Sequence, residues 1–130
     1  MSVIRRAQLE FVALPGRDAA DPFRDTEAPA SSVRIVDVRR TAERTAHIHP
    51  DSEEIFHVVS GTGNVWIDGT IEPIGPGDTI RIPPGAAHGT VPDSGVTMRL
   101  VCFFPHPNLA TNHEPTQINV TDEVSALEET

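Results

Sequence analysis

The sequence predicts an all-β protein whose strands form a sandwich or a barrel. Short runs rich in valine, isoleucine and threonine recur along the chain, and glycine, proline and aspartate residues separate them. Twelve prolines and nine glycines in 130 residues favour many turns over long helices. Regularly spaced short strands with turns between them are typical of sandwiches and barrels, and the length is that of a single domain.

The N-terminal part is predicted to supply an arm and the first strand of the barrel. Residues 3–14 contain one or two short strand patterns, whereas residues 15–32 are rich in Pro, Gly, Asp and Ala and are expected to be a loop or an arm on the surface. Residues 33–38 alternate apolar and charged side chains, which indicates a half-buried strand. The predicted N-terminal arm therefore covers residues 1–32, and the predicted barrel covers residues 33–106.

The middle of the chain is predicted to form short strands joined by tight turns. Residues 45–49 and 54–59 are apolar and β-branched, and a Pro-Asp-Ser turn separates them. Asp68 and Gly69 lie between two apolar runs, which is a strong signal for a two-residue hairpin. Residues 79–82 form a further short strand between two Gly- and Pro-rich turns.

The most apolar segment, residues 96–104, is predicted to be a central strand. Its alternating side chains form two faces, one with Met98, Leu100, Cys102 and Phe104 and the other with Arg99, Val101 and Phe103. The sequence does not decide which face is internal. After Pro105 the chain is polar, so residues 107–130 are predicted to be a C-terminal tail, with residues 121–129 able to form a short acidic helix.

Composition excludes several classes of function. The net charge of −9, without a basic cluster, argues against a nucleic-acid partner. The absence of lysine excludes a Schiff base, and the absence of tyrosine excludes a phenolic acid. The chain has no apolar run of the roughly 18 residues that a membrane helix needs, no secretory signal, and a single cysteine, Cys102. We therefore expect a soluble, cytoplasmic protein that has no membrane partner.

Three histidines and one glutamate fall in two short blocks and are candidate metal ligands. His47 and His49 lie two residues apart on a predicted strand, so their imidazoles point to the same side. Glu54 opens the next strand, and His88 follows a Pro-Pro-Gly turn that could direct it back to the first block. A lone histidine is more often structural than a ligand, but imidazole and carboxylate groups at ordered spacing suit a divalent transition metal.

The two blocks resemble the two motifs of the small single-domain cupins. The first cupin motif reads Gly, five residues, His-x-His, three or four residues, Glu, six residues, Gly, and this chain has in that order Thr41, His47, His49, Glu54 and Gly61. The second reads Gly, five residues, Pro-x-Gly, two residues, His, three residues, Asn, and this chain has Gly77, Pro83, Gly85, His88 and Pro92. Only the first and last positions differ, as Thr41 and Pro92, and neither is a ligand position.

The resemblance implies a double-stranded β-helix, an antiparallel jelly-roll barrel with a metal inside it. It implies the ligands His47, His49, Glu54 and His88, and as cofactor one divalent transition metal: Fe(II), Mn(II), Ni(II), Co(II) or Zn(II). The six-residue gap to the second glycine selects Glu54 as the carboxylate ligand. The competing Glu53 would face the other way.

Six residues are candidates for a substrate pocket: Phe56, Val58, Trp66, Ile82, Arg99 and Phe104. Phe56 and Val58 share the face of Glu54, whereas His57 points to the opposite side. Arg99 could bind a substrate carboxylate if its face of the strand is internal. His106 and His113 lie beyond the last apolar strand and could reach the pocket mouth, although a surface position is the default for a histidine.

Three histidines and one carboxylate leave two adjacent positions open on an octahedral ion. We therefore predict a metal-dependent small-molecule enzyme, foremost a dioxygenase-like oxidoreductase that acts on a small anionic or enolisable metabolite, with Glu54 as one possible base. The alternatives are a lyase, isomerase or cyclase in which the metal stabilises an enolate, and a non-catalytic protein that binds a small ligand. The expected partners are a small-molecule substrate and a second copy of the chain, because edge strands need covering and the arm at residues 1–32 is long enough to lie on a partner sheet.

Overall fold

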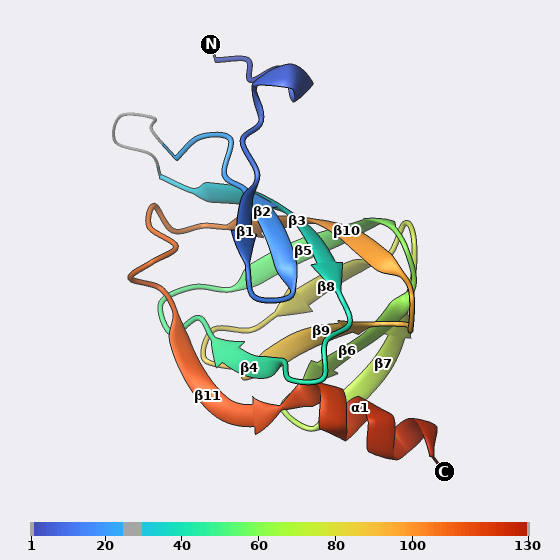
Figure 1. The fold of residues 1–130 in the computed structure, drawn as a ribbon. Helices are drawn as coiled ribbons and strands as arrows, with labels where there is room; N and C mark the ends of the chain where they lie inside the picture. Colours follow the sequence, from blue (N-terminus) through green and yellow to red (C-terminus); the bar gives the residue numbers. More distant parts are fainter. Residues whose placement is uncertain (1, 25–29, 130) are drawn as a thin grey trace.

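The structure is a computed structural model that describes residues 2–24 and 30–129, and it consists of two antiparallel β-sheets (Figure 1). The six-stranded sheet, called sheet A, has the order β1 (Val12–Leu14), β2 (Arg17–Ala20), β3 (Ser32–Arg39), β10 (Thr97–Phe104), β5 (Glu54–Ser60) and β8 (Thr79–Ile82). The five-stranded sheet, called sheet B, has the order β11 (Glu114–Asn119), β4 (Thr45–Ile48), β9 (His88–Pro92), β6 (Gly63–Ile67) and β7 (Thr70–Ile74). From β3 onwards the chain crosses repeatedly between the sheets, as in a jelly roll. The predicted double-stranded β-helix is therefore confirmed.

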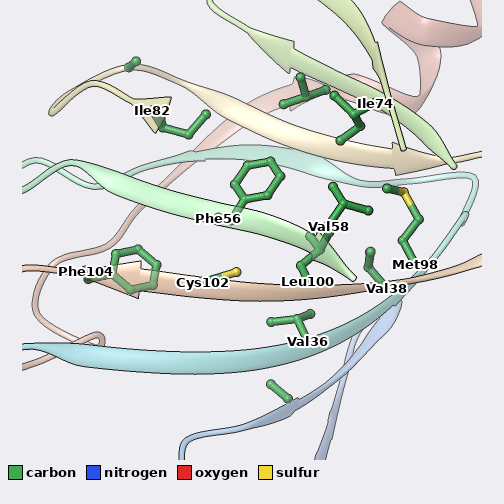
Figure 2. Packing of buried hydrophobic residues seen from close by; sticks show 13 residues of the cluster. Val36, Val38, Phe56, Val58, Ile74, Ile82, Met98, Leu100, Cys102 and Phe104 are labelled. Atoms are coloured by element: carbon green, nitrogen blue, oxygen red, sulfur yellow. The ribbon is translucent and has the colours of Figure 1, made fainter. Parts of the chain in front are cut away.

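The main hydrophobic core fills the space between the sheets. Figure 2 shows side chains converging there from three neighbouring strands of sheet A: Val36 and Val38 of β3, Phe56 and Val58 of β5, and Met98, Leu100, Cys102 and Phe104 of β10. This packing settles which face of the 96–104 segment is internal. The other face of β10 is external, where the Arg99 guanidinium donates to Asp37 at 2.8 and 2.9 Å.

The hairpin between β6 and β7 has the predicted two-residue turn. Ile67 pairs with Thr70, so that Asp68 and Gly69 alone connect the strands. Both turn residues have positive φ angles, 45° for Asp68 and 91° for Gly69. That conformation matches the twist of the strands, and glycine adopts it without steric cost.

The N-terminal arm differs from the expected surface loop. After a short 3-10 helix η1 (Arg6–Gln8), β1 and β2 form a hairpin that extends sheet A next to β3. The sequence pattern did not predict β2, because its four residues carry two charges and adjoin a Pro-Gly turn. Pairing with β3 satisfies its backbone, and its register turns Arg17 and Ala19 towards the interior together with Val38 and Val36. Residues 25–29 of the predicted arm lie outside the described part of the chain.

The C-terminal segment is a strand followed by a helix rather than a tail. Strand β11 adds to the edge of sheet B beside β4, and α1 (Val120–Glu128) follows at the predicted place (Figure 1). The helix buries Val120 and Val124 in a second apolar cluster with Trp66 and Val91 of sheet B. Strand β11 carried no sequence signal, because its outer position leaves most of its side chains exposed. Among the described residues, no helix has the length and apolar character needed to cross a membrane.

Candidate metal centre

The four predicted ligands meet where strands from the two sheets begin or end. His47 lies near the end of β4 and pairs with His88, the first residue of β9, while Glu54 is the first residue of β5 on the facing sheet. His49 follows β4 directly. One donor atom from each of these four residues can be chosen so that all lie within 4.8 Å of one another. The structure therefore brings together the whole set that the two motifs indicated.

Backbone carbonyl groups fix the orientation of two of the imidazoles. His49 Nδ1 lies 2.7 Å from the carbonyl oxygen of Asn112, and His88 Nδ1 lies 3.0 Å from that of Ala86. Because a carbonyl oxygen only accepts, each Nδ1 must carry the proton and donate it. In the neutral rings the lone pair is then on Nε2, which points into the site.

These lone pairs face the Glu54 carboxylate. Glu54 Oε1 lies 2.9 Å from His88 Nε2 and 3.3 Å from His49 Nε2, and the His49 nitrogen is buried without a hydrogen-bond partner in the described structure. Neutral imidazoles whose lone pairs face a carboxylate are repelled by it unless a cation lies among them, either a metal ion or a proton that makes His88 Nε2 a donor to Glu54 Oε1. The donor set thus fits a divalent metal ion, and imidazole with carboxylate suits Fe(II), Mn(II), Ni(II), Co(II) and Zn(II).

The electrostatics of the group favour the ligating protonation states of Glu54 and His47. Burial alone would raise the pKa of Glu54, but the His49 and His88 imidazoles, when they carry a proton on Nε2, outweigh burial and hold that pKa well below its usual range. Burial, together with the charge of His88, lowers the pKa of His47 well below its ordinary value. A deprotonated carboxylate beside neutral imidazoles is the state that binds a metal.

Glu53 and His57, which strand parity assigned to the opposite side, lie outside the group. Glu53 forms an ion pair with Arg81 at 2.8 Å, and the exposed His57 shares a hydrogen bond with the Thr79 hydroxyl at 2.8 Å. The two neighbouring glutamates therefore point in opposite directions, with Glu54 inward.

A small cavity of about 70 Å³ adjoins the candidate ligands. Two of the six predicted pocket residues, Phe56 and Phe104, line this cavity. The Phe104 ring contacts the His49 ring edge-on, with 4.7 Å between the ring centroids. A wider hollow of about 310 Å³ shares Arg34 and Leu109 with this cavity. The two spaces therefore adjoin at these residues.

The other four predicted pocket residues do not line this cavity, which corrects that expectation. Val58 and Ile82 are inward as expected, but they pack in the main core beside the cavity. Trp66 is in the second cluster, under α1, because its face of β6 points away from sheet A. Arg99 is on the external face of β10 with Asp37.

Three arginines that the sequence analysis did not propose reach the cavity, and so does His113, which it named as a candidate for the pocket mouth. Arg17, Arg34 and Arg44 line it, and so does His113, whose ring is stacked on His47 at 5.2 Å between centroids. The signal for Arg34 was available, since it alternates with Val36 and Val38 and so shares their face. His106, the other candidate for the mouth, is instead 3.7 Å from Asp51.

Comparison with known proteins identifies the family. Residues 34–104, more than half of the chain, match the family model of the cupin domain, and the chain therefore belongs to the cupin family. The uncharacterized protein MJ1618 of Methanocaldococcus jannaschii is 33% identical over 72 residues, a match that covers 55% of this chain and 55% of that protein. The chain thus spans about half the length of this curated relative.

Several solved structures share the fold. The nucleoside dehydratase Pac13 of Streptomyces has a TM-score of 0.72 at 18% identity, over 95% of this chain and 97% of that one. The polyketide cyclase RemF of Streptomyces resistomycificus has a TM-score of 0.69 at 22% identity, over 92% and 84%. KdgF of Halomonas sp. has a TM-score of 0.68 at 23% identity, over 82% and 94%. At these identities the similarity establishes the fold alone.

Proposed function

We propose that the protein is a metal-dependent enzyme that converts a small metabolite without net oxidation, as a lyase, isomerase or cyclase. The observation that carries this proposal is the buried group of His47, His49, Glu54 and His88, whose lone pairs converge beside a cavity. A nucleoside dehydratase and a polyketide cyclase on the same fold support a non-redox reaction. A bound divalent metal would act there as a Lewis acid that stabilises negative charge developing on a substrate oxygen.

The surrounding side chains have separate tasks in this proposal. Phe56 and Phe104 give the cavity apolar walls that exclude water from the reacting group. His113 is the one histidine lining the cavity that lies outside the ligand group, so it is placed to carry a proton to or from a bound substrate. Glu54 directs Oε1 at two imidazoles. This favours a role for Glu54 as a metal ligand over the role of general base that the sequence left open.

A dioxygenase is the second candidate. Three imidazoles and one carboxylate leave two positions of an octahedral ion free, enough for a substrate atom and dioxygen. This ligand set serves both reaction classes, so the consumption of dioxygen distinguishes them.

The test combines metal loading with an oxygen electrode. Metal-free protein is loaded separately with Fe(II), Mn(II), Ni(II), Co(II) or Zn(II) and assayed on hydroxy acids, 2-oxo acids and diketones, with product and dissolved oxygen followed together. We expect turnover that a chelator abolishes and a metal restores, without oxygen uptake. Oxygen uptake equal to turnover would establish the dioxygenase instead. Full turnover by metal-free protein would contradict both candidates.

A further inference from the structure

Two arginines in the cavity have no hydrogen-bond or ion-pair partner among the residues that the structure describes. The Nε atoms of Arg17 and Arg44 are buried without a hydrogen bond, and neither guanidinium forms an ion pair with any residue that the structure describes. Arg17 reaches the cavity from β2 in sheet A, and Arg44 reaches it from the residue preceding β4 in sheet B. Two cations from different sheets thus border one small space.

The other half-buried arginines of the described chain show how unusual this is. Each of them pairs with a carboxylate: Arg34 with Asp21, Arg39 with Asp18, Arg40 with Glu128 and Arg99 with Asp37. A guanidinium whose Nε is buried without a partner lowers the stability of the fold, and a chain with nineteen acidic residues has ample carboxylates to supply one. The cost of leaving Arg17 and Arg44 unpaired among the described residues favours a bound anion that neutralises them.

The charge of the cavity has the sign that an anion requires. Its lining holds three guanidinium groups, whereas the nearby carboxylates are Glu54 and the Asp21 that pairs with Arg34. A divalent ion at the candidate ligands would add further positive charge. Burial lowers the pKa of Arg44 to about 10 and, with the charge of Arg34, lowers that of Arg17, yet Arg44 stays a cation at neutral pH. The interior is therefore positive in a protein whose net charge is −9.

We propose that Arg17 and Arg44 form the binding site for an anionic group of the substrate, a carboxylate or a phosphoryl group, while the rest of the substrate reaches towards the candidate metal ligands. The inference rests on the proposed function in that it names the substrate class of the same cavity. Guanidinium forks match both kinds of oxyanion and can bind them with paired hydrogen bonds. The inner cavity is lined by both the arginines and the candidate ligands, so a small anionic molecule in it would contact both, and the hollow of about 310 Å³ that shares Arg34 and Leu109 with it has room for a larger part of the molecule.

Calorimetry with simple anions tests the site without any assumption about the reaction. Malonate and inorganic phosphate are titrated into metal-free wild-type protein and into Arg17→Met, Arg44→Met and Arg99→Met, with uncharged malonamide as the neutral probe. Methionine keeps the unbranched aliphatic part of the side chain and removes the charged guanidinium. Arg99→Met is the matched control, because Arg99 is on the external face of sheet A with Asp37.

We expect wild-type protein and Arg99→Met to bind at least one of the two anions and not malonamide, and each cavity variant to bind about 10-fold more weakly or worse. Which anion binds identifies a carboxylate or a phosphoryl group. In the absence of anion, Arg44→Met should melt no lower than the wild type, because an unpaired buried charge has been removed; a merely structural arginine would melt lower. Arg44→Lys keeps the charge but not the forked guanidinium. Its affinity for the anion should therefore lie between that of the wild type and that of Arg44→Met.

The variants distinguish failure of this inference from failure of the proposed metal centre. His49→Ala should lose metal and keep its anion binding in the metal-free state, whereas Arg17→Met and Arg44→Met should keep their metal content. If the wild type binds neither anion, or if both arginine variants bind it as the wild type does, the inference is overturned. If the chain binds no metal but shows anion binding that depends on the arginines, the proposed function fails while the inference stands.

Discussion

A single proton position at His49 determines what the site can bind. Its Nδ1 donates to the Asn112 carbonyl, so Nε2 offers a lone pair in a buried place where no described group donates to it. We expect about one divalent metal ion per chain, and we expect His49→Ala to lower the metal affinity by more than the 10- to 100-fold known for losing a second-shell partner. The measurement is metal content after dialysis.

His57→Ala is the matched control, because His57 is exposed on the external face of β5. That variant should keep its metal. Full occupancy in His49→Ala would show that the converging lone pairs are not a metal site.

Glu54 and Glu53 are neighbours in sequence with opposite roles in the structure. Glu54 is buried against His49 and His88, whereas Glu53 pairs with Arg81 near the surface. We expect Glu54→Gln to weaken metal binding, because an amide oxygen lacks the charge that holds a cation, and Glu53→Gln to leave it unchanged. Competition with a colorimetric chelator ranks the two variants, and the reverse order would overturn this strand register.

Cys102 lines the cavity, but its surroundings make it unreactive. Burial, followed by the charge of Glu54, raises the pKa of its thiol well above the ordinary value, so the nucleophilic thiolate is scarce at neutral pH. We expect slow labelling of Cys102 by a thiol reagent in the folded protein. Cys102→Ser should keep both its metal and its activity, and a loss of activity with metal retained would refute this.

The sequence predicted which four residues gather at the candidate metal centre, but it predicted pocket residues poorly, for a physical reason. Strand alternation put His47 and His49 on one face, whereas the choice of Glu54 over Glu53 and the inclusion of His88 came from the resemblance to the cupin motifs. A pocket wall depends on how two sheets are stacked. Parity correctly put Val58 and Ile82 inside, but it could not say that they pack beside the cavity rather than around it.

At the scale of elements, Asn119 connects the C-terminal helix to the cavity. Its side-chain oxygen accepts from the Thr121 N–H at 3.1 Å, which caps α1, and from the Arg44 N–H at 3.2 Å, while its amide donates to the Ala42 carbonyl. We expect Asn119→Ala to lower the free energy of unfolding in urea by about 1–2 kcal/mol, because the cap and the bond to the Arg44 backbone are lost together.

Gln117→Ala is the control for that change, since Gln117 is an exposed residue of the same strand. It should unfold at the same urea concentration as the wild type. Equal stability of Asn119→Ala and Gln117→Ala would mean that water replaces the Asn119 bonds without loss.

The elements that the sequence missed share one property. Strand β2 carries charges, β9 contains a glycine and ends at a proline, and β11 is mostly exposed, so none displays a clean alternation of apolar side chains. Each forms because a neighbouring strand offers backbone partners. Such strands follow from the tertiary structure and carry little local signal.

At the scale of the whole molecule, the homodimer stays a prediction, and the outer face of sheet A is the surface on which we place it. Phe103 of β10 pairs with Val33 of β3 and Ile55 of β5, so an apolar row crosses three adjacent strands on the side away from the core. Phe103 is 38% exposed, and the strand edges at β1 and β8 are also open in the described chain. An exposed apolar sheet face of this kind favours contact with a second copy.

We therefore expect light scattering at micromolar concentration to give twice the mass of one chain, and Phe103→Asp to give a single chain, because a charge in the middle of the row would be buried unpaired on association. Ile118→Asp is the matched control, since Ile118 has a similar exposed fraction of 37% but is on β11 in sheet B. It should remain a dimer. A wild-type mass of one chain would refute the dimer, and dissociation by Ile118→Asp but not by Phe103→Asp would move the interface to sheet B.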